Sequence, residues 1–262
     1  MSRYYTRVCN FYYGSKSKAL IKKAKSLPLN GNDLISFDEI EIISRKSIKK
    51  LSIKKINDLP HLLKKIVKKD IKLITKKKKF KNLNFKTLPK IMGVLNMTPD
   101  SFSDGGKYNK DYLAKKRLNY LFNSGANIVD IGGESTRPGS KPISSKIEWN
   151  RIKYILNNFN KKNFLSLDTR KSHIMEKGIN SGVALINDVS GLSYDKNSIK
   201  VLKKYKIPFV LQHSLGNPDV MQNNPKYKNE LLDIYDFFEK KIEYLRTNGI
   251  DHNNIILDPG IG

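Results

Sequence analysis

The chain has 262 residues, of which 39% are hydrophobic and 28% are charged. This apolar content is enough for a hydrophobic core and excludes a wholly disordered protein. No run of about 18 apolar residues occurs, so the sequence predicts no transmembrane helix. Cys9 is the single cysteine, which excludes an intramolecular disulfide and favours a reducing compartment, the cytoplasm.

Lys and Arg outnumber Asp and Glu by 50 to 24, giving a formal net charge of +26. The excess is concentrated in residues 1–90, with 25 basic and 6 acidic residues, against 25 and 18 in residues 91–262. Only 8 of the 50 basic residues are Arg, the residue on which phosphate and base recognition depend most. The charge therefore favours a solvated basic surface over nucleic-acid binding. Residues 1–32 contain no acid, and an organelle transit peptide is weighed as a minor alternative.

The sequence divides near residue 88 into a basic N-terminal extension, 1–87, with no assigned role, and a domain, 88–262. In the extension, a loose alternation over residues 37–56 predicts one or two strands. The spacing of Leu59, Leu62, Leu63, Ile66 and Val67 predicts a basic amphipathic helix over residues 59–74. Asp58 is the expected N-cap and Pro60 lies in the first turn. We expect its apolar face to pack against the protein, not a membrane, and residues 76–86 to be a linker.

From residue 90 onward, short apolar runs alternate with segments of helical periodicity. The runs occupy residues 91–95, 128–131, 164–167, 183–186, 209–211 and 255–257. Between residues 167 and 183 the predicted helix is short and contains Gly178. Nearly continuous apolar strands that alternate with helices predict an α/β fold, with a parallel sheet covered by helices.

A polar residue stands at or just after the end of each predicted strand. These residues are Asn96, Asp130, Asp168, Asn187, His213 and Asp258. The active sites of parallel α/β folds lie at the carboxyl ends of their strands. Asp and Asn are also common turn residues, but six polar residues at six strand ends favour a ring of functional groups at the mouth of a barrel.

Two long loops follow the first two predicted strands, at residues 96–106 and 130–139. The first is rich in oxygen ligands, among them Asn96 and Asp104, and the second offers Thr136 and the cation Arg137. Together these groups predict a site for a divalent metal and a phosphorylated substrate.

At these two loops the sequence resembles the dihydropteroate synthases, a family of pterin-binding enzymes. The resemblance is carried by residues 91–106 (IMGVLNMTPDSFSDGG) and 130–139 (DIGGESTRPG). It continues through 166–169 (SLDT), 186–188 (IND), 212–213 (QH), 216–218 (GNP), 221–222 (MQ), 225–227 (PKY) and 257–262 (LDPGIG). It covers about residues 88–262.

The resemblance implies a (β/α)₈ TIM-type barrel and a transferase of folate biosynthesis. The implied reaction joins 6-hydroxymethyl-7,8-dihydropterin diphosphate to 4-aminobenzoate, giving 7,8-dihydropteroate and diphosphate. The implied partners are these small-molecule substrates and a second copy of the protein in a homodimer. The implied cofactor is Mg²⁺, held by Asn96. The implied catalytic residues are Asp104, Asp130 and Arg137. The implied substrate-binding residues are Thr136, Pro138, Asp168, Asn187, Gln212 and Asp258.

The sequence departs from the family pattern at its end. The match reaches Gly262, just after the sixth predicted strand, whereas the family pattern continues with a basic segment in the loop of a seventh strand and another after an eighth. We therefore expect an incomplete barrel of about six βα units, truncated at its C-terminus. The alternatives are a non-catalytic relative that binds a pterin or a partner chain and a related pterin-dependent methyltransferase. The two loop motifs favour the synthase.

Overall fold

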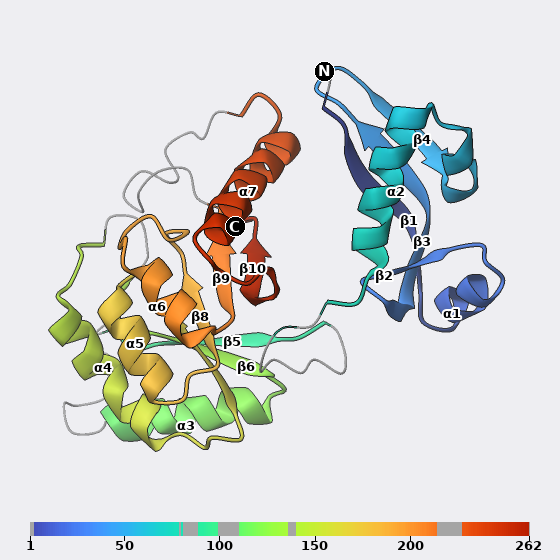
Figure 1. Ribbon diagram of the computed structural model, residues 1–262. Helices are drawn as coiled ribbons and strands as arrows, with labels where there is room; N and C mark the ends of the chain where they lie inside the picture. The colour runs from blue at the N-terminus through green and yellow to red at the C-terminus, as the bar shows by residue number, and fades with distance from the viewer. Residues whose placement is uncertain are drawn as a thin grey trace. The chain divides into compact units, whose positions relative to one another are not determined.

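The computed structural model of the protein describes residues 3–78, 80, 89–98, 110–135, 140–213 and 227–261 (Figure 1). Contacts between residues divide the chain into two compact units, Met1–Lys79 and Phe80–Gly262. We call these the N-terminal unit and the C-terminal unit. The boundary predicted near residue 88 falls among residues 81–88, outside the described residues, and stays a prediction.

The N-terminal unit is a four-stranded antiparallel sheet with two α-helices. Strand β3 is central to it, because β1, β2 and β4 all pair with β3. The elements in chain order are β1 (Tyr5–Tyr13), α1 (Gly14–Lys22), β2 (Leu27–Leu29), β3 (Asn32–Ile43), β4 (Ile48–Ser52), a short 3-10 helix (Ile53–Asp58) and α2 (His61–Thr75). Its core joins β3 to α2, where Phe37 and Ile40 are fully buried in one cluster with Val67.

The strands predicted within residues 37–56 are confirmed by β3 and β4. The predicted helix is α2, but it begins at His61 instead of residue 59. Pro60 precedes the helix with φ −51° and ψ 145°, and Leu59 is extended with φ −68° and ψ 149°. A residue before proline is driven out of the helical region, so the helix cannot begin earlier. The prediction of Asp58 as the N-cap was wrong, since Asp58 ends the preceding 3-10 helix.

The C-terminal unit contains a six-stranded sheet in the order β10-β9-β8-β7-β6-β5, and every neighbouring pair is parallel. The elements in chain order are β5 (Met92–Asn96), α3 (Lys110–Asn123), β6 (Ile128–Gly132), α4 (Ser145–Asn158), β7 (Phe164–Asp168), α5 (Ser172–Asn180), β8 (Leu185–Asp188), α6 (Ser198–Tyr205), β9 (Phe209–Gln212), α7 (Glu230–Thr247), a short 3-10 helix (His252–Asn254) and β10 (Ile255–Asp258). This confirms the six predicted strands to within one or two residues. Within the described residues, the sheet is an incomplete TIM-type barrel with edges at β5 and β10.

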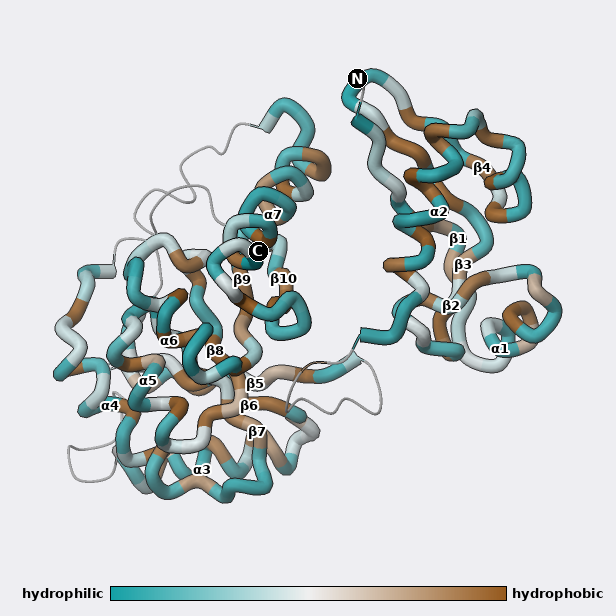
Figure 2. The backbone as a smooth tube through the Cα atoms, in the orientation of Figure 1, coloured by the Kyte–Doolittle hydropathy of each residue, from teal (hydrophilic) through white to brown (hydrophobic). Residues whose placement is uncertain are grey.

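The two faces of this sheet carry different side chains. On the outward face, Val129 and Ile131 of β6 are buried in the large core formed with helices α3 to α7. On the inward face, Ile128 of β6 packs with Leu185 of β8 and Val210 of β9. Figure 2 shows the strands of this sheet mainly towards the hydrophobic end of the scale. Burial on both faces explains why these strands read as continuous apolar runs.

Gly178 has a packing role in the short helix α5. A Cβ atom at this position would collide with Cδ2 of Leu167 on β7. Only glycine lets the helix approach the strand this closely, which offsets its low helix propensity.

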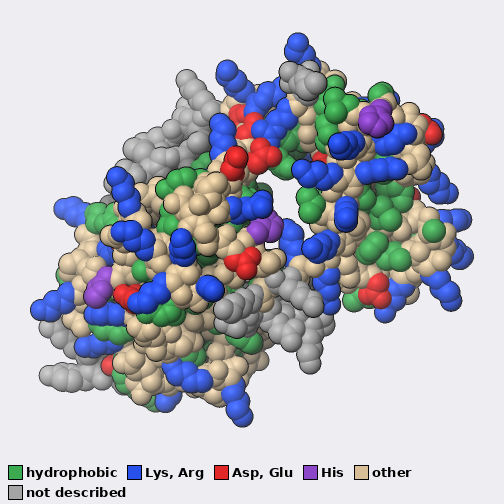
Figure 3. Space-filling model, viewed as in Figure 1, with side chains coloured by type: hydrophobic (Ala, Val, Ile, Leu, Met, Phe, Trp, Pro, Cys, Tyr) green, Lys and Arg blue, Asp and Glu red, His purple; other side chains and the backbone are tan. Residues whose placement is uncertain are grey.

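None of the helices among the described residues is long and apolar enough to cross a bilayer. Lys and Arg side chains are spread over the visible face of each unit and do not gather in one patch (Figure 3). This distribution agrees with the solvated basic surface that the sequence predicts.

Candidate functional site

Four neighbouring strands align one residue each at the same level of the sheet, near the strand ends, and three of these residues are polar. The strand register aligns Asn96 with Gly132, Gly132 with Asp168, and Asp168 with Asn187. Side chains alternate along a strand, so Gly132 shares the inward face of β6 with Ile128. The row therefore lies inside the sheet, at its carboxyl end. On β9 and β10, Gln212 and Asp258 are paired in the same way.

Gly132 leaves a gap in this row. A Cβ atom at Gly132 would lie 3.3 Å from Oδ2 of Asp168 and 3.5 Å from Oδ1 of Asn96. The two oxygens therefore flank the same point of the backbone, with no side chain between them. At Gly132, therefore, no side chain covers the backbone between the Asp168 carboxylate and the Asn96 amide.

Asp168 lies in an environment that disfavours its charge. Burial raises the pKa of its carboxyl well above the ordinary value, and the negative charges of Asp130, Asp188, Glu148 and Glu134 raise it further. Within the described residues, no side chain donates a hydrogen bond to it. A ligand that offers N–H donors or a positive charge to Asp168 would relieve this penalty.

Asp130 lies one layer deeper, two residues before Gly132 on the same face of β6. Its side chain is buried, and Asn187 Nδ2 donates a 2.8 Å hydrogen bond to its Oδ2. Burial raises the pKa of Asp130, and the hydrogen bonds from Ser166 and Asn187 oppose the rise. The buried hydroxyl of Ser166 lies at the paired position of β7 and faces the same carboxylate. Asp130 thus orients the Asn187 amide.

At the other edge of the sheet, Asp258 is half-buried and partly engaged by its own turn. The amide of Gly260 donates a 2.8 Å hydrogen bond to its Oδ1. Gly260 has φ +71°, and a Cβ there would lie 2.6 Å from the carbonyl oxygen of His213. One carboxylate oxygen of Asp258 thus stabilises the turn, and the other is available to a ligand.

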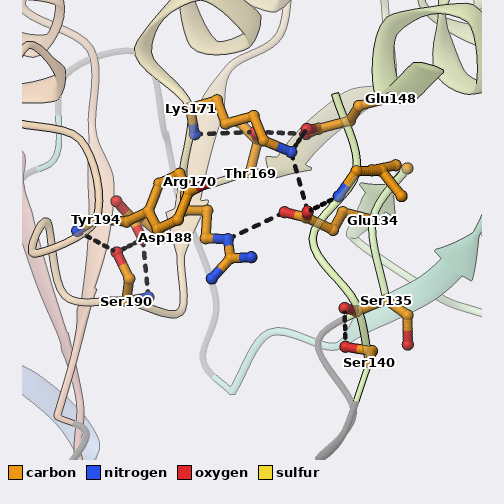
Figure 4. Close-up of polar contacts among 12 residues, drawn as sticks. Glu134, Ser135, Ser140, Glu148, Thr169, Arg170, Lys171, Asp188, Ser190 and Tyr194 are labelled. Carbon is orange, nitrogen blue, oxygen red and sulfur yellow. Dashed lines mark hydrogen bonds and ion pairs between the residues drawn. The ribbon is translucent and has the colours of Figure 1, made fainter. Parts of the chain in front are cut away.

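Behind this row lies a cluster of buried charges that the sequence analysis did not single out (Figure 4). Lys171 Nζ lies 3.0 Å from Glu134 Oε1 and 2.6 Å from Glu148 Oε2. Arg170 Nε lies 3.0 Å from Glu134 Oε2, and Thr169 Oγ1 donates a 2.5 Å hydrogen bond to Glu148 Oε1. We call Glu134, Glu148, Arg170 and Lys171 the loop-base cluster. One feature of the sequence could have indicated this cluster. Glu148 is a charged residue on the apolar face of a helix, one turn before the buried Ile152.

Asp188, directly after Asn187, points to the outward face of β8. It is fully buried and accepts hydrogen bonds from the amide (2.8 Å) and hydroxyl (2.6 Å) of Ser190, while its Oδ2 has no partner. Burial raises the pKa of Asp188 to about 6, against the Ser190 hydrogen bonds that lower it.

The structure thus brings together Asn96, Asp130, Asp168 and Asn187, with Gln212 and Asp258 on the two strands beyond. The roles predicted for these residues stay predictions. The predicted residues Asp104, Thr136, Arg137 and Pro138 lie outside the described residues. Among the described residues, no group of three His, Cys, Asp or Glu side chains could hold a metal ion. Asn96 provides one neutral oxygen near Asp168 Oδ2, a donor set that fits Mg²⁺ only with further oxygens from a substrate.

Comparisons with known proteins match the C-terminal unit. The sequence model of a family described as pterin binding enzyme matches residues 92–262. The dihydropteroate synthase of Clostridium beijerinckii is 42% identical over 175 residues, which cover 66% of this chain and 62% of that protein. The Escherichia coli K12 dihydropteroate synthase is 36% identical over 176 residues, covering 66% and 62%. The chain thus spans about 62% of the length of these curated relatives.

Solved structures of dihydropteroate synthases also resemble this chain. A Clostridium difficile dihydropteroate synthase, crystallised in the presence of pteroic acid, superposes with a TM-score of 0.62 at 36% identity, over 69% of this chain and 67% of that one. An Anaplasma phagocytophilum dihydropteroate synthase with bound 6-hydroxymethylpterin-monophosphate gives a TM-score of 0.59 at 34% identity, over 66% and 68%.

Proposed function

Because this chain belongs to the pterin binding enzyme family, we propose that it carries the pterin site of a dihydropteroate synthase. The reaction joins 6-hydroxymethyl-7,8-dihydropterin diphosphate to 4-aminobenzoate, with loss of diphosphate, in folate biosynthesis. The observation that carries the proposal is the Asp168 carboxylate beside the Gly132 gap, without a protein donor among the described residues. The two relatives compared above by sequence, at 36% and 42% identity, support it.

The chemistry of a pterin fits this row. The 2-amino-4-oxo edge of a pterin presents neighbouring N–H donors, and a carboxylate such as Asp168 accepts two such bonds. Asn187 donates to Asp130 and so keeps its amide oxygen as an acceptor for the ligand. We assign Asp130 to holding this orientation, and Asp258 and Gln212 to the far side of the ring.

The leaving diphosphate requires a different set of groups. We propose that Asn96 contributes one oxygen to a Mg²⁺ ion held mainly by the diphosphate, and that Mg²⁺ supplies the neutralisation of its negative charge. By resemblance, Thr136, Arg137 and Pro138 lie near the aminobenzoate and the leaving group. Asp104 helps to order the first loop around the reacting carbon.

The compartment and assembly are also part of the proposal. The one cysteine, Cys9, is a free thiol, which supports a cytoplasmic protein. A homodimer is proposed from the resemblance alone.

The test is a calorimetric titration of the protein with 6-hydroxymethylpterin monophosphate. We expect saturable binding, and we expect Asp168→Ala to weaken it by more than about 2 kcal/mol, roughly 30-fold, because a charged acceptor is lost. Asp111→Ala, at an exposed carboxylate on α3, is the control and should bind as the wild type does. Unchanged affinity in Asp168→Ala, or no binding by the wild type, would contradict the proposal.

A further inference from the structure

The residues that follow the row on β6 and β7 point to the outward side of the sheet, against α4. Side chains alternate along a strand, and Asp168 faces inward, so Thr169 faces outward, where it is 3% exposed. Gly133 follows Gly132 in the same way, and a Cβ atom there would lie 2.9 Å from the carbonyl oxygen of Glu148 on α4. The ends of both strands therefore pack directly against this helix.

The side chain of Glu148 holds the hydroxyl of Thr169 (Figure 4). Thr169 Oγ1 donates a 2.5 Å hydrogen bond to Glu148 Oε1 and accepts a 3.3 Å hydrogen bond from the amide of Lys171. Glu148 is fully buried, and its other oxygen, Oε2, lies 2.6 Å from Lys171 Nζ. The hydroxyl thus has both a donor and an acceptor as partners, and together they fix the orientation of Thr169.

The main chain of Thr169 is bonded to the next strand of the row. Its amide donates a 3.0 Å hydrogen bond to the carbonyl oxygen of Asn187 on β8. Thr169 therefore joins the end of β7 to Asn187 on one side and to α4 on the other. Since no described side chain donates a hydrogen bond to the Asp168 carboxylate, the backbone of residues 168–169 sets its position. Hydrogen bonds weaken steeply when their geometry is lost, so a small shift of this backbone would weaken the contact of Asp168 with a ligand.

We infer that Thr169 is a positioning residue: by anchoring the end of β7 to Glu148, its hydroxyl holds the Asp168 carboxylate where the N–H donors of the pterin reach it. The inference deepens the proposed function and rests on it. If the hydroxyl served only the packing of α4, its loss would lower stability, and any loss of affinity would not depend on Asp168. The dependence on Asp168 is therefore the decisive readout.

The test is a double-mutant cycle on pterin affinity, measured by calorimetry with 6-hydroxymethylpterin monophosphate below the melting temperature of each variant. Thr169→Val removes the hydroxyl but keeps the shape of the side chain. We expect it to lower the affinity about 10-fold, as for other residues that orient a binding group. In the Asp168→Ala background the same change should cost less than about 2-fold, because the carboxylate that the hydroxyl positions is absent.

Matched variants separate this effect from general damage. Thr169→Ser keeps the hydroxyl and should retain the affinity to within about 3-fold of the wild type. Thr75→Val removes a hydroxyl that donates a 2.8 Å hydrogen bond to the carbonyl oxygen of Ile71 on α2, and it should not change the affinity. Thr169→Ala and Thr169→Ser differ only in the hydroxyl, so this pair carries the test if Thr169→Val does not fold.

Each remaining outcome contradicts a definite claim. An equal loss from Thr169→Val in the wild-type and Asp168→Ala backgrounds, or no loss in either, would overturn the positioning role. An equal loss in Thr169→Ser and Thr169→Val would also overturn it, because the hydroxyl would not be responsible. A wild-type protein that binds the pterin no more tightly than Asp168→Ala does would contradict the assignment of Asp168. A wild-type protein that binds no pterin would overturn the proposed function itself and, with it, this inference.

Discussion

The N-terminal and C-terminal units handle their polar groups in opposite ways. In the N-terminal unit, ion pairs such as Lys50–Glu39 lie at the surface. Its buried hydroxyls are satisfied, as in the 2.9 Å hydrogen bond between Ser26 and Ser36. In the C-terminal unit the ion pairs of the loop-base cluster are buried. Among the described residues, all buried side-chain atoms without a hydrogen-bond partner belong to this unit.

Buried polar atoms without partners cost free energy. Asp130 and Ser166 are buried on the inward strand face directly beneath the row of Asn96, Gly132 and Asp168. Within the described part of the chain, the other unpartnered atoms are Asp188 Oδ2 on the outward face of β8, Ser198 Oγ on α6 and Asn254 Oδ1 in the 3-10 helix before β10. The N-terminal unit has no such atoms among its described residues, which agrees with a structural role for its polar groups.

The largest difference between the units should appear in the cost of removing one charge. Glu148→Ala leaves Lys171 with one carboxylate fewer and Thr169 without its acceptor, in a dry interior. We expect a loss of about 3–5 kcal/mol of unfolding free energy, measured by urea denaturation. Asp33→Ala, which removes the partner of Lys18 at the surface, should change stability little. Equal costs for the two variants would break the comparison.

The next largest effect is a pH dependence of the unfolding free energy, which we expect in the C-terminal unit. The pKa of Asp188 is about 6 in the folded state, against an ordinary value of 3.8, so folding holds this proton more tightly. Its stabilising contribution is complete below pH about 4 and is lost as the pH rises through about 6, a change of roughly 3 kcal/mol.

Urea denaturation between pH 4 and 7, a range set by that pKa, measures this contribution. The unfolding free energy of Asp188→Asn, relative to the wild type, should rise with pH. Asp33→Asn, at an exposed carboxylate of the N-terminal unit, should follow the wild-type profile. A parallel profile for Asp188→Asn would show that this carboxyl does not hold its proton.

Two neighbouring glycines should separate binding from stability. Gly132→Ala places a methyl group between Asp168 and Asn96 and should lower pterin affinity by about 10-fold, with little change in melting temperature. Gly133→Ala places one 2.9 Å from the carbonyl oxygen of Glu148 and should cost about 1–3 kcal/mol of stability. Calorimetric titration and thermal melting of both variants check this. Unchanged affinity in Gly132→Ala, with a loss of affinity in Gly133→Ala, would show that the ligand does not bind beside Gly132.

The smallest expected effect concerns Mg²⁺. Asn96 offers a single neutral oxygen, and Mg²⁺ prefers substrate phosphates and water. Titration of the protein with Mg²⁺ alone should therefore show no measurable heat, and addition of diphosphate should allow binding that Asn96→Ala weakens. Tight binding of Mg²⁺ without diphosphate would refute this assignment.

The sequence predicted the parts of the structure that depend on local patterns. The six strands of the parallel sheet were recognised because both of their faces are buried, and their polar ends marked the row at the site. Strand β1 and helix α1 were not predicted, because β1 is stabilised by pairing with β3, with Tyr5 opposite Ile43 far along the chain.

The loop-base cluster was missed for the same reason. Glu134 and Lys171 are ordinary charged residues in the sequence, and only the parallel pairing of β6 with β7 brings their loops together. The gap at Gly132 is likewise visible only once Asn96 and Asp168 are aligned on either side of it. Contacts between distant segments are what a single sequence does not display.

The most direct test of the central claim is amide hydrogen exchange with and without 6-hydroxymethylpterin monophosphate. A ligand that binds the folded C-terminal unit slows its exchange. We predict slower exchange at the amides that follow the strand ends, Met97, Thr169 and His213, whose hydrogen bonds to the neighbouring strand end are 2.7–3.0 Å long. Residues 3–78 should exchange at unchanged rates. Protection in the N-terminal unit, or none at the strand ends, would contradict the account.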